Sequence, residues 1–204
     1  LTSELAGRLR DNGIPTVLVN RRDLGGSNPS VVADNRQGAA AIARYLSSKG
    51  HQNFVYVAGL RSSSTNRDRQ NGFTATLKKL GHPPPVVLRG EYDPQVACDA
   101  VARLLKTASK SPDALFVAND HMAIAILDLL RYQFDFKVPQ DLAVVGFDNI
   151  PMASSPSYQL TTYSQPVKAM VDQAVDLLIR RIEEPQYSFP TRVVPGELII
   201  RTSA

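Results

Sequence analysis

Short apolar runs and amphipathic segments alternate along most of this chain. Continuous apolar runs with the length of buried strands lie at residues 54–58, 86–88, 114–118 and 142–147. Between these runs, apolar side chains recur every three or four residues, the spacing of one helix face, as at Ala39, Ile42 and Leu46. The alternation predicts an α/β fold in which helices cover a doubly wound parallel sheet, built from four β units between residues 35 and 147.

Capping residues set the predicted helix boundaries. Asn35 can cap a helix over about residues 37–49, and Gly50 can end it. Asp120 directly precedes the apolar pattern of a helix predicted over residues 120–131. We therefore expect Asp120 to be the N-cap of that helix in preference to a ligand contact.

Residues before Asn35 and after Thr162 continue the pattern with fewer elements. They contain apolar runs at 17–19 and 31–32, a long amphipathic helix after Gln165, and a last strand predicted over residues 197–200. The apolar stripe of that helix comprises Val167, Met170, Val171, Ala174, Leu178 and Ile182. So few elements cannot cover their own apolar faces, which predicts that they belong to a second lobe.

Two lobes are therefore predicted. The N-terminal lobe comprises residues 1–34 and 164–190, and the C-terminal lobe comprises residues 35–163 and 191–204. The chain starts at Leu1 directly in helix-like sequence. We expect the first lobe to be incomplete, with its opening strands preceding Leu1.

Composition indicates an ordinary globular protein. The chain has 204 residues, 43% of them hydrophobic, and no apolar run approaches the length of about 20 residues needed to cross a membrane. Its single cysteine, Cys98, excludes an internal disulfide framework and fits a reducing compartment. The net charge of +4 comes from basic residues scattered singly or in pairs, which indicates a solvated surface rather than a nucleic-acid-binding stripe.

Polar side chains follow the ends of the predicted strands, where parallel sheets place their ligand sites. They are Asn20, Arg21, Ser62, Ser63, Ser64, Thr65, Arg69, Glu91, Tyr92, Asn119, Asp120, Asp148 and Asn149. Such a set suits a polyhydroxylated or charged small molecule, because arginine donates a fixed fork while carboxylates and amides accept hydrogen bonds. Asp148 is the strongest candidate, since an acid after a fully apolar strand is costly to bury without a partner.

Two of these candidates have structural alternatives. Tyr92 can equally be a half-buried surface aromatic. Arg69 lies within a predicted helix and can form a surface ion pair with Asp68 or another acid. From position alone, we hold the surface ion pair to be the better explanation of Arg69.

The sequence favours a binding module over an enzyme. The three histidines, His51, His82 and His121, lack metal-ligand spacing, and Cys98 has no histidine near it in sequence. Nucleophile-elbow, dinucleotide-binding and phosphate-loop motifs are also absent from the sequence. We expect no catalytic residues, no metal and no cofactor.

Seven segments in order resemble the lactose-repressor/galactose-repressor (LacI/GalR) family of bacterial transcription regulators, specifically its effector-binding core. They are residues 13–20, 32–35, 51–59, 67–73, 117–123, 138–149 and 160–166, among them Val-Val-Gly-Phe-Asp-Asn and Leu-Thr-Thr-Tyr-Ser-Gln-Pro. The resemblance implies a two-lobed periplasmic-binding-protein-like fold with an effector, usually a sugar or related metabolite, between the lobes. The chain would cross between lobes near Asp34, Tyr163 and Thr191.

The resemblance also implies roles for particular residues and partners. In the family, positions matching Arg69 and Asp148 commonly bind the effector. The resemblance therefore favours an effector contact over a surface ion pair as the role of Arg69. Contacts are also implied for Asn20, Arg21, Thr65, Tyr92, Asn119 and Gln165. The family further implies a cytoplasmic homodimer that binds operator DNA through a headpiece absent from this chain, without a membrane partner. Asp135 departs from the family, which usually has glycine there, so that turn is expected to differ.

Two other functional classes stay open. An exported sugar-binding protein that feeds an uptake transporter shares the fold. The pairing of Val-Val-Gly-Phe-Asp-Asn with Leu-Thr-Thr-x-x-Gln-Pro favours the regulator, and the sequence upstream of Leu1 would settle the question. An α/β enzyme would need an acid–base or nucleophile pair in the cleft, and none is visible in the sequence.

Overall fold

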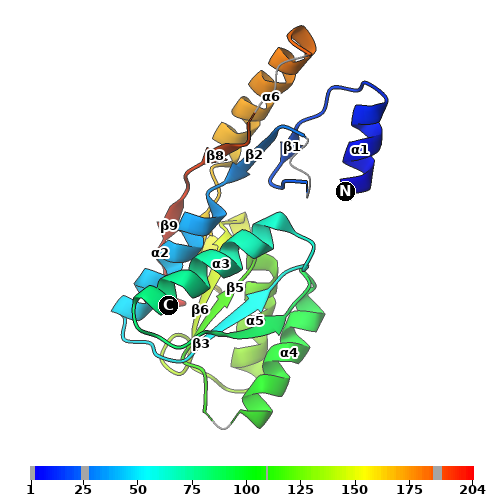
Figure 1. The fold of residues 1–204 in the computed structure, drawn as a ribbon. Coiled ribbons are helices and arrows are strands. Elements are labelled where there is room, and N and C mark those ends of the chain that lie inside the picture. Colours follow the sequence, from blue (N-terminus) through cyan, green and yellow to red (C-terminus); the bar gives the residue numbers. More distant parts are fainter. Residues whose placement is uncertain (1–2, 24–27, 109, 186–189) are drawn as a thin grey trace. The chain divides into compact units, whose positions relative to one another are not determined.

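The computed structural model describes residues 3–23, 28–108, 110–185 and 190–204 (Figure 1). The chain forms two compact units: the first comprises Leu1–Asn35 and Pro166–Gly196, and the second comprises Arg36–Gln165 and Glu197–Ala204. The last boundary lies later than the one predicted at residue 191. The reason is that strand β8 (Arg192–Val194) pairs in parallel with β2 (Ser30–Ala33) of the first unit.

The second unit contains a six-stranded sheet with the order β4-β3-β5-β6-β7-β9. Its strands are β3 (Phe54–Ala58), β4 (Val86–Arg89), β5 (Ala114–Val117), β6 (Ala143–Asp148), β7 (Thr161–Ser164) and β9 (Glu197–Ile199). All neighbours pair in parallel except β7 and β9, which are antiparallel. The predicted parallel α/β architecture is confirmed, and β9 adds an antiparallel edge strand to it.

Helices cover both faces of this sheet (Figure 1). Helices α2 (Asn35–Ser48) and α3 (Ser64–Lys79) lie on one face, and α4 (Pro94–Thr107) and α5 (Asp120–Gln133) lie on the other. Strands β3 and β5 are buried along their whole length, as their continuous apolar runs predict. A short 3-10 helix, η1 (Pro151–Ser154), follows β6.

A row of aromatic rings fills the space under α2 and α3. It runs from Phe73 of α3 through Tyr56, Phe116 and Phe147 to Tyr163 of β7, with neighbouring ring centroids 4.9 to 6.3 Å apart. All five side chains are at most 4% exposed. This row connects the sheet to the helix that carries Arg69.

Helices α2 and α3 approach each other closely at Gly72. A Cβ atom at this position would lie 2.3 Å from the main-chain oxygen of Arg36, which is far inside contact distance. Only a residue without a side chain therefore fits on this turn of α3. Gly72 follows Arg69 by three residues, so it lies on the same side of the helix.

The first unit contains a three-stranded parallel sheet with the order β1-β2-β8, where β1 is Leu18–Val19. Helix α1 (Ser3–Asp11) and helix α6 (Val167–Glu183) complete its described elements. The buried residues of α6 are Met170, Ala174 and Leu177, and they pack with β2 and β8. None of the helices in the described residues combines the length and the apolar character that crossing a membrane requires.

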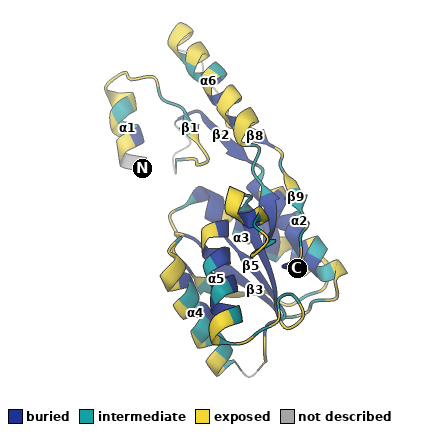
Figure 2. Cartoon of the chain, turned by 180° about the vertical axis from the view of Figure 1, so that it is seen from behind, coloured by how far each residue is buried: buried dark blue, intermediate teal, exposed yellow. Residues whose placement is uncertain are grey.

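The predicted apolar stripe of α6 is partly wrong. Val167, Val171 and Ile182 belong to that stripe but are 62%, 48% and 57% exposed (Figure 2). The cause is that α6 contacts the small sheet along only one narrow line, through Met170, Ala174 and Leu177. Apolar residues on two neighbouring faces of a helix form one broad stripe in sequence, and periodicity alone does not show which part is buried.

Candidate functional site

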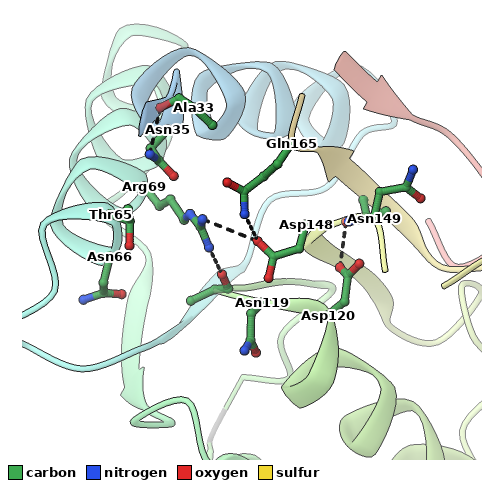
Figure 3. A network of polar contacts seen from close by, with 12 residues as sticks. Ala33, Asn35, Thr65, Asn66, Arg69, Asn119, Asp120, Asp148, Asn149 and Gln165 are labelled. Atoms are coloured by element: carbon green, nitrogen blue, oxygen red, sulfur yellow. Dashed lines mark hydrogen bonds and ion pairs between the residues drawn. The ribbon is translucent and has the colours of Figure 1, made fainter. Parts of the chain in front are cut away.

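Arg69, Asp148 and Gln165 form one contact cluster in the second unit (Figure 3). Asp148 is the last residue of β6, at the carboxyl end of the strand. The Nη2 atom of Arg69 lies 3.5 Å from Asp148 Oδ1, and Gln165 Nε2 donates a hydrogen bond of 2.5 Å to the same oxygen. The structure therefore brings together three predicted site residues that are distant in sequence.

The Arg69 side chain is fixed on three sides. Its Nη1 atom donates to the main-chain oxygen of Ala118, and its Cζ atom lies 3.7 Å from the ring centroid of Phe147. The side chain is only 3% exposed, so the alternative of a surface ion pair is wrong. A guanidinium stacked on a ring and paired with a carboxylate is held rigidly, and its orientation is set before any ligand arrives.

The backbone at the end of β6 has an uncommon conformation. Asp148 has a φ of 127° and Asn149 a φ of 57°, and two successive positive values are rare outside glycine. Each such residue costs roughly 1–3 kcal/mol unless the surroundings hold it, and strain of this kind clusters at ligand sites. Here the Asn149 amide donates to Thr162 Oγ1 at 3.4 Å, and the Gln165 amide donates to the Asp148 carbonyl at 3.5 Å.

Asp120 is not the N-cap of α5, which corrects the prediction. Asn119 caps the helix, because its Oδ1 accepts from the Met122 amide at 3.1 Å. Asp120 is the first helical residue and is completely buried; it accepts hydrogen bonds from Thr162 Oγ1 at 2.6 Å and from the Ile150 amide at 3.0 Å. The sequence missed this role because both bonds come from residues more than 25 positions away.

Burial and neighbouring charges shift the pKa of both carboxyl groups. Burial raises the pKa of Asp148 to about 6; the Arg69 guanidinium opposes this rise, the Asp120 carboxylate adds to it, and the Gln165 hydrogen bond opposes it. Burial also raises the pKa of Asp120, against the hydrogen bond from Thr162. Asp148 therefore changes charge close to neutral pH, while it stays within reach of an arginine.

The raised pKa of Asp148 predicts a pH-dependent stability. Because the folded value lies above the unfolded one, the folded state binds an extra proton between about pH 4 and pH 6, and the native chain loses stability as the pH rises through that window. The variant Asp148→Asn lacks this titration. The quantity to compare is the unfolding free energy of the variant minus that of the native chain. We expect this difference to be more positive at pH 7 than at pH 4, by an amount on the order of 2 kcal/mol.

Urea unfolding curves of both proteins at several pH values measure this difference. Comparing two proteins at each pH removes the contribution of all other titrating groups. A difference that stays constant between pH 4 and pH 7 would contradict the raised pKa of Asp148.

Tyr92 and Thr65 form a second cluster at the carboxyl ends of β3 and β4. The Tyr92 hydroxyl lies 3.4 Å from Ser63 Oγ and 3.5 Å from Thr65 Oγ1. The ring covers Gly59, where a Cβ atom would lie 2.1 Å from a ring carbon, and Tyr92 itself has a φ of 61°. Gly59 was not among the predicted site residues; its place directly after the strand at 54–58 was the only available signal.

The remaining predicted residues have less direct places. Asn119 caps α5 and directly follows Ala118, whose carbonyl accepts from Arg69. Asn20 and Arg21 are exposed and follow β1 in the first unit, where Asn20 has a φ of 57°. Their contact with a ligand held by Arg69 and Asp148 stays a prediction. Asp135 adopts a left-handed φ of 55°, so it takes the conformation for which glycine is usual.

The arrangement is suited to holding a small molecule by hydrogen bonds. A carboxylate and two amides can accept hydrogen bonds from hydroxyl groups, the guanidinium and the amides can donate, and the Tyr92 ring can cover an apolar face. Within the described part of the chain, no group of three or more His, Cys, Asp or Glu residues is placed to hold a metal ion.

Comparison with known proteins gives consistent relatives. A family model described as a periplasmic binding protein-like domain matches residues 43–204. The ribose operon repressor of Escherichia coli (strain K12) is 32% identical over 174 residues, covering 84% of this chain and 52% of the repressor. The transcriptional repressor PurR of Aliivibrio fischeri (strain MJ11) is 28% identical over 200 residues, covering 95% of this chain and 58% of that protein. The chain thus spans little more than half the length of these relatives.

Solved structures with the same fold are also similar in sequence. A LacI transcriptional regulator from a Rhodococcus species superimposes with a TM-score of 0.90 at 27% identity, covering 100% of this chain and 74% of the other. A complex of the transcriptional regulator CelR with cellobiose also gives a TM-score of 0.90, at 28% identity over 98% of this chain and 62% of the other.

Proposed function

Because this chain belongs to the periplasmic-binding-protein-like family of LacI/GalR regulators, we propose that it is the part of a bacterial transcription regulator that senses a small-molecule effector. The observation that carries this proposal is the pairing of Arg69 with Asp148 at the carboxyl end of β6. This is where parallel sheets bind ligands, and the partly exposed Asp148 carboxylate offers an acceptor beside the guanidinium that holds it.

A sugar or a related polyhydroxylated metabolite is the effector class that these groups suit best. The Asp148 carboxylate can accept from two hydroxyl groups, while Arg69 and Gln165 donate to ring or hydroxyl oxygens. One relative is named as the ribose operon repressor, and CelR was solved in complex with cellobiose. Both names support a sugar as the effector class. The proposed effector contacts are Arg69, Asp148, Asn20, Arg21, Thr65, Tyr92, Asn119 and Gln165.

The proposal extends to the partners of the intact protein. We expect a cytoplasmic homodimer that binds operator DNA through a headpiece outside this chain, in which the effector changes DNA affinity by binding two states unequally. The named relatives are repressors, which favours a regulator over an exported binding protein and over an enzyme.

A thermal-shift screen of the intact protein tests the ligand class. The screen contains pentoses, hexoses, disaccharides, their phosphates, and nucleobases. We expect at least one sugar to raise Tm by several degrees, since a ligand at 100 times its Kd adds about 2.7 kcal/mol to the unfolding free energy. Failure of every sugar, together with a shift by a nucleobase or a phosphate, would contradict the assignment of ligand class. The same compound should then change operator binding in a gel-shift experiment, which an exported binding protein would not show.

A further inference from the structure

The C-terminal segment of the second unit reaches the turn that follows β6. Arg201 Nη2 donates to Asn149 Oδ1 at 2.8 Å, and Arg201 Nη1 donates to the main-chain oxygen of Leu160 at 2.6 Å. The Arg201 amide also donates to Thr161 Oγ1 at 2.9 Å. A single guanidinium therefore bridges the residue next to Asp148 and the chain just before β7.

Asn149 shares the uncommon backbone of Asp148, and both ends of its side chain are engaged. Its Oδ1 accepts from Arg201, and its Nδ2 donates to Ser164 Oγ at 3.2 Å. Successive residues with positive φ persist only where their surroundings determine them fully. The two side-chain hydrogen bonds of Asn149 help to hold this backbone conformation. The bond from Arg201 has a charged donor, which makes it the stronger type of hydrogen bond.

The direction of the Asp148 carboxylate depends on this backbone. The backbone dihedral angles of Asp148 set the direction in which its side chain leaves the chain, the hydrogen bonds of Asn149 hold the following peptide in place, and Asp148 Oδ1 meets both Arg69 and Gln165. We propose that Arg201 is a positioning residue of the candidate site: by clamping Asn149 it maintains the conformation that aims Asp148 at Arg69. The inference rests on the proposed function only where Asp148 is said to contact the effector.

Ser203 provides a matched control in the same segment. It is 1% exposed, donates to the Val144 carbonyl at 2.6 Å, and accepts from the Thr161 amide at 2.8 Å. It therefore also anchors the C-terminal segment to β6 and β7, and none of its hydrogen bonds involves Asn149. If Arg201 only stabilised the fold, Ser203→Ala would have the same consequences as Arg201→Ala.

Chemical shifts of the Asp148 and Asn149 Cα and Cβ atoms in the ligand-free intact protein test the positioning role directly. These shifts report backbone conformation, and selective labelling of Asp and Asn makes them observable. We expect them to move in Arg201→Ala and in Arg201→Lys, because lysine keeps the charge but cannot bridge two acceptors with a planar fork. In Ser203→Ala they should stay at native values while Tm falls.

The variant Asn149→Gly extends the test. Glycine takes a positive φ without strain, so in this background Arg201→Ala should leave the Asp148 shifts unchanged. Unchanged Asp148 and Asn149 shifts in both folded Arg201 variants would overturn the inference. Equal changes in Ser203→Ala would overturn it as well.

Titration of the same proteins with D-ribose in a calorimeter separates this inference from the proposed function. We expect Kd to rise about tenfold in Arg201→Ala, the loss of roughly one hydrogen bond to a charged group, and to stay unchanged in Ser203→Ala. If the shifts move but ribose affinity does not, the positioning role stands and the proposed contact between Asp148 and the ligand is wrong. If the native protein does not bind ribose, only the proposed ligand class is contradicted, because the chemical shifts are measured without ligand.

Discussion

Replacing Asp148 with alanine is expected to weaken effector binding about 100-fold and to remove most of the ligand-induced rise in Tm. The carboxylate is the acceptor on which Arg69 and Gln165 converge, and it is the group proposed to accept hydrogen bonds from the ligand; a hydrogen bond to a charged group contributes about 1.5–3 kcal/mol. Calorimetric titration at pH 7.5, with the strongest compound of the thermal-shift screen, measures the loss. The fold should survive, because an ionised Asp148 is held above its usual pKa and contributes no net stability there.

Asp99→Ala is the matched control for this prediction. Asp99 is exposed on α4, where it accepts a hydrogen bond from Gln95 at 2.9 Å. Its removal deletes the same charge as Asp148→Ala, but on the face of the sheet opposite to the helix that carries Arg69 (Figure 1). We expect unchanged affinity and an unchanged ligand-induced shift. Native-like affinity in Asp148→Ala, or an equal loss in both variants, would show that Asp148 does not grip the ligand.

Arg69 differs from Asp148 in what its loss would do to the fold. Its side chain is buried between Phe147, the Ala118 carbonyl and Asp148, so Arg69→Ala should lower both ligand affinity and the free energy of unfolding. Ligand experiments on variants of either residue therefore include a measurement of the folded fraction, because Asp148→Ala also removes the carboxylate that faces the buried guanidinium.

Gly72→Ala is expected to lower the free energy of unfolding of the native chain. A methyl group there would lie 2.3 Å from the Arg36 carbonyl, and main chain cannot move aside as a flexible side chain can. Overpacking of this kind costs about 1–3 kcal/mol and sometimes more. Separation of α3 from α2 should also displace Arg69, so we expect weaker effector binding in the protein that remains folded. Urea unfolding and calorimetric titration measure the two effects.

Gly7→Ala is the matched control for Gly72→Ala. Gly7 lies in helix α1, and a Cβ atom there would have no atom within 4 Å. Alanine favours a helix over glycine by up to about 1 kcal/mol, so this variant should be neutral or slightly more stable. Equal stability of Gly72→Ala and the native chain would show that the two helices lie further apart than described.

The central strands of the main sheet could be predicted from the sequence because they are buried on both faces, whereas the apolar run at 86–88 forms an exposed edge strand, β4. Runs such as 54–58 and 114–118 stay apolar throughout, and few other structures explain short continuous runs bounded by turns. The exposed face of α6 could not be predicted in the same way. Its periodicity shows a broad apolar stripe, but the buried part depends on where β2 and β8 lie.

Local patterns made the site predictable where strand ends supplied the signal, whereas Arg69 and Gln165 were expected only from the family resemblance. Asp148 is conspicuous because it follows an apolar strand. Its contacts with Arg69 and Gln165, the burial of Asp120, and the bond from Arg201 to Asn149 join residues that are 79, 17, 42 and 52 positions apart. No local pattern encodes such distances. The close approaches at Gly59 and Gly72 likewise depend on tertiary packing. A glycine in the sequence does not show whether it is needed for close packing or for a turn.

The pairing of Arg69 with Asp148 also bears on discrimination between a sugar and its phosphate ester. The two groups already balance each other's charge, and Asp120 lies close enough to raise the pKa of Asp148. An uncharged ligand can replace water around this pair without changing the buried charge. A phosphorylated ligand would place roughly two further negative charges near the carboxylates. We therefore expect the site to bind a free sugar more tightly than its phosphate ester.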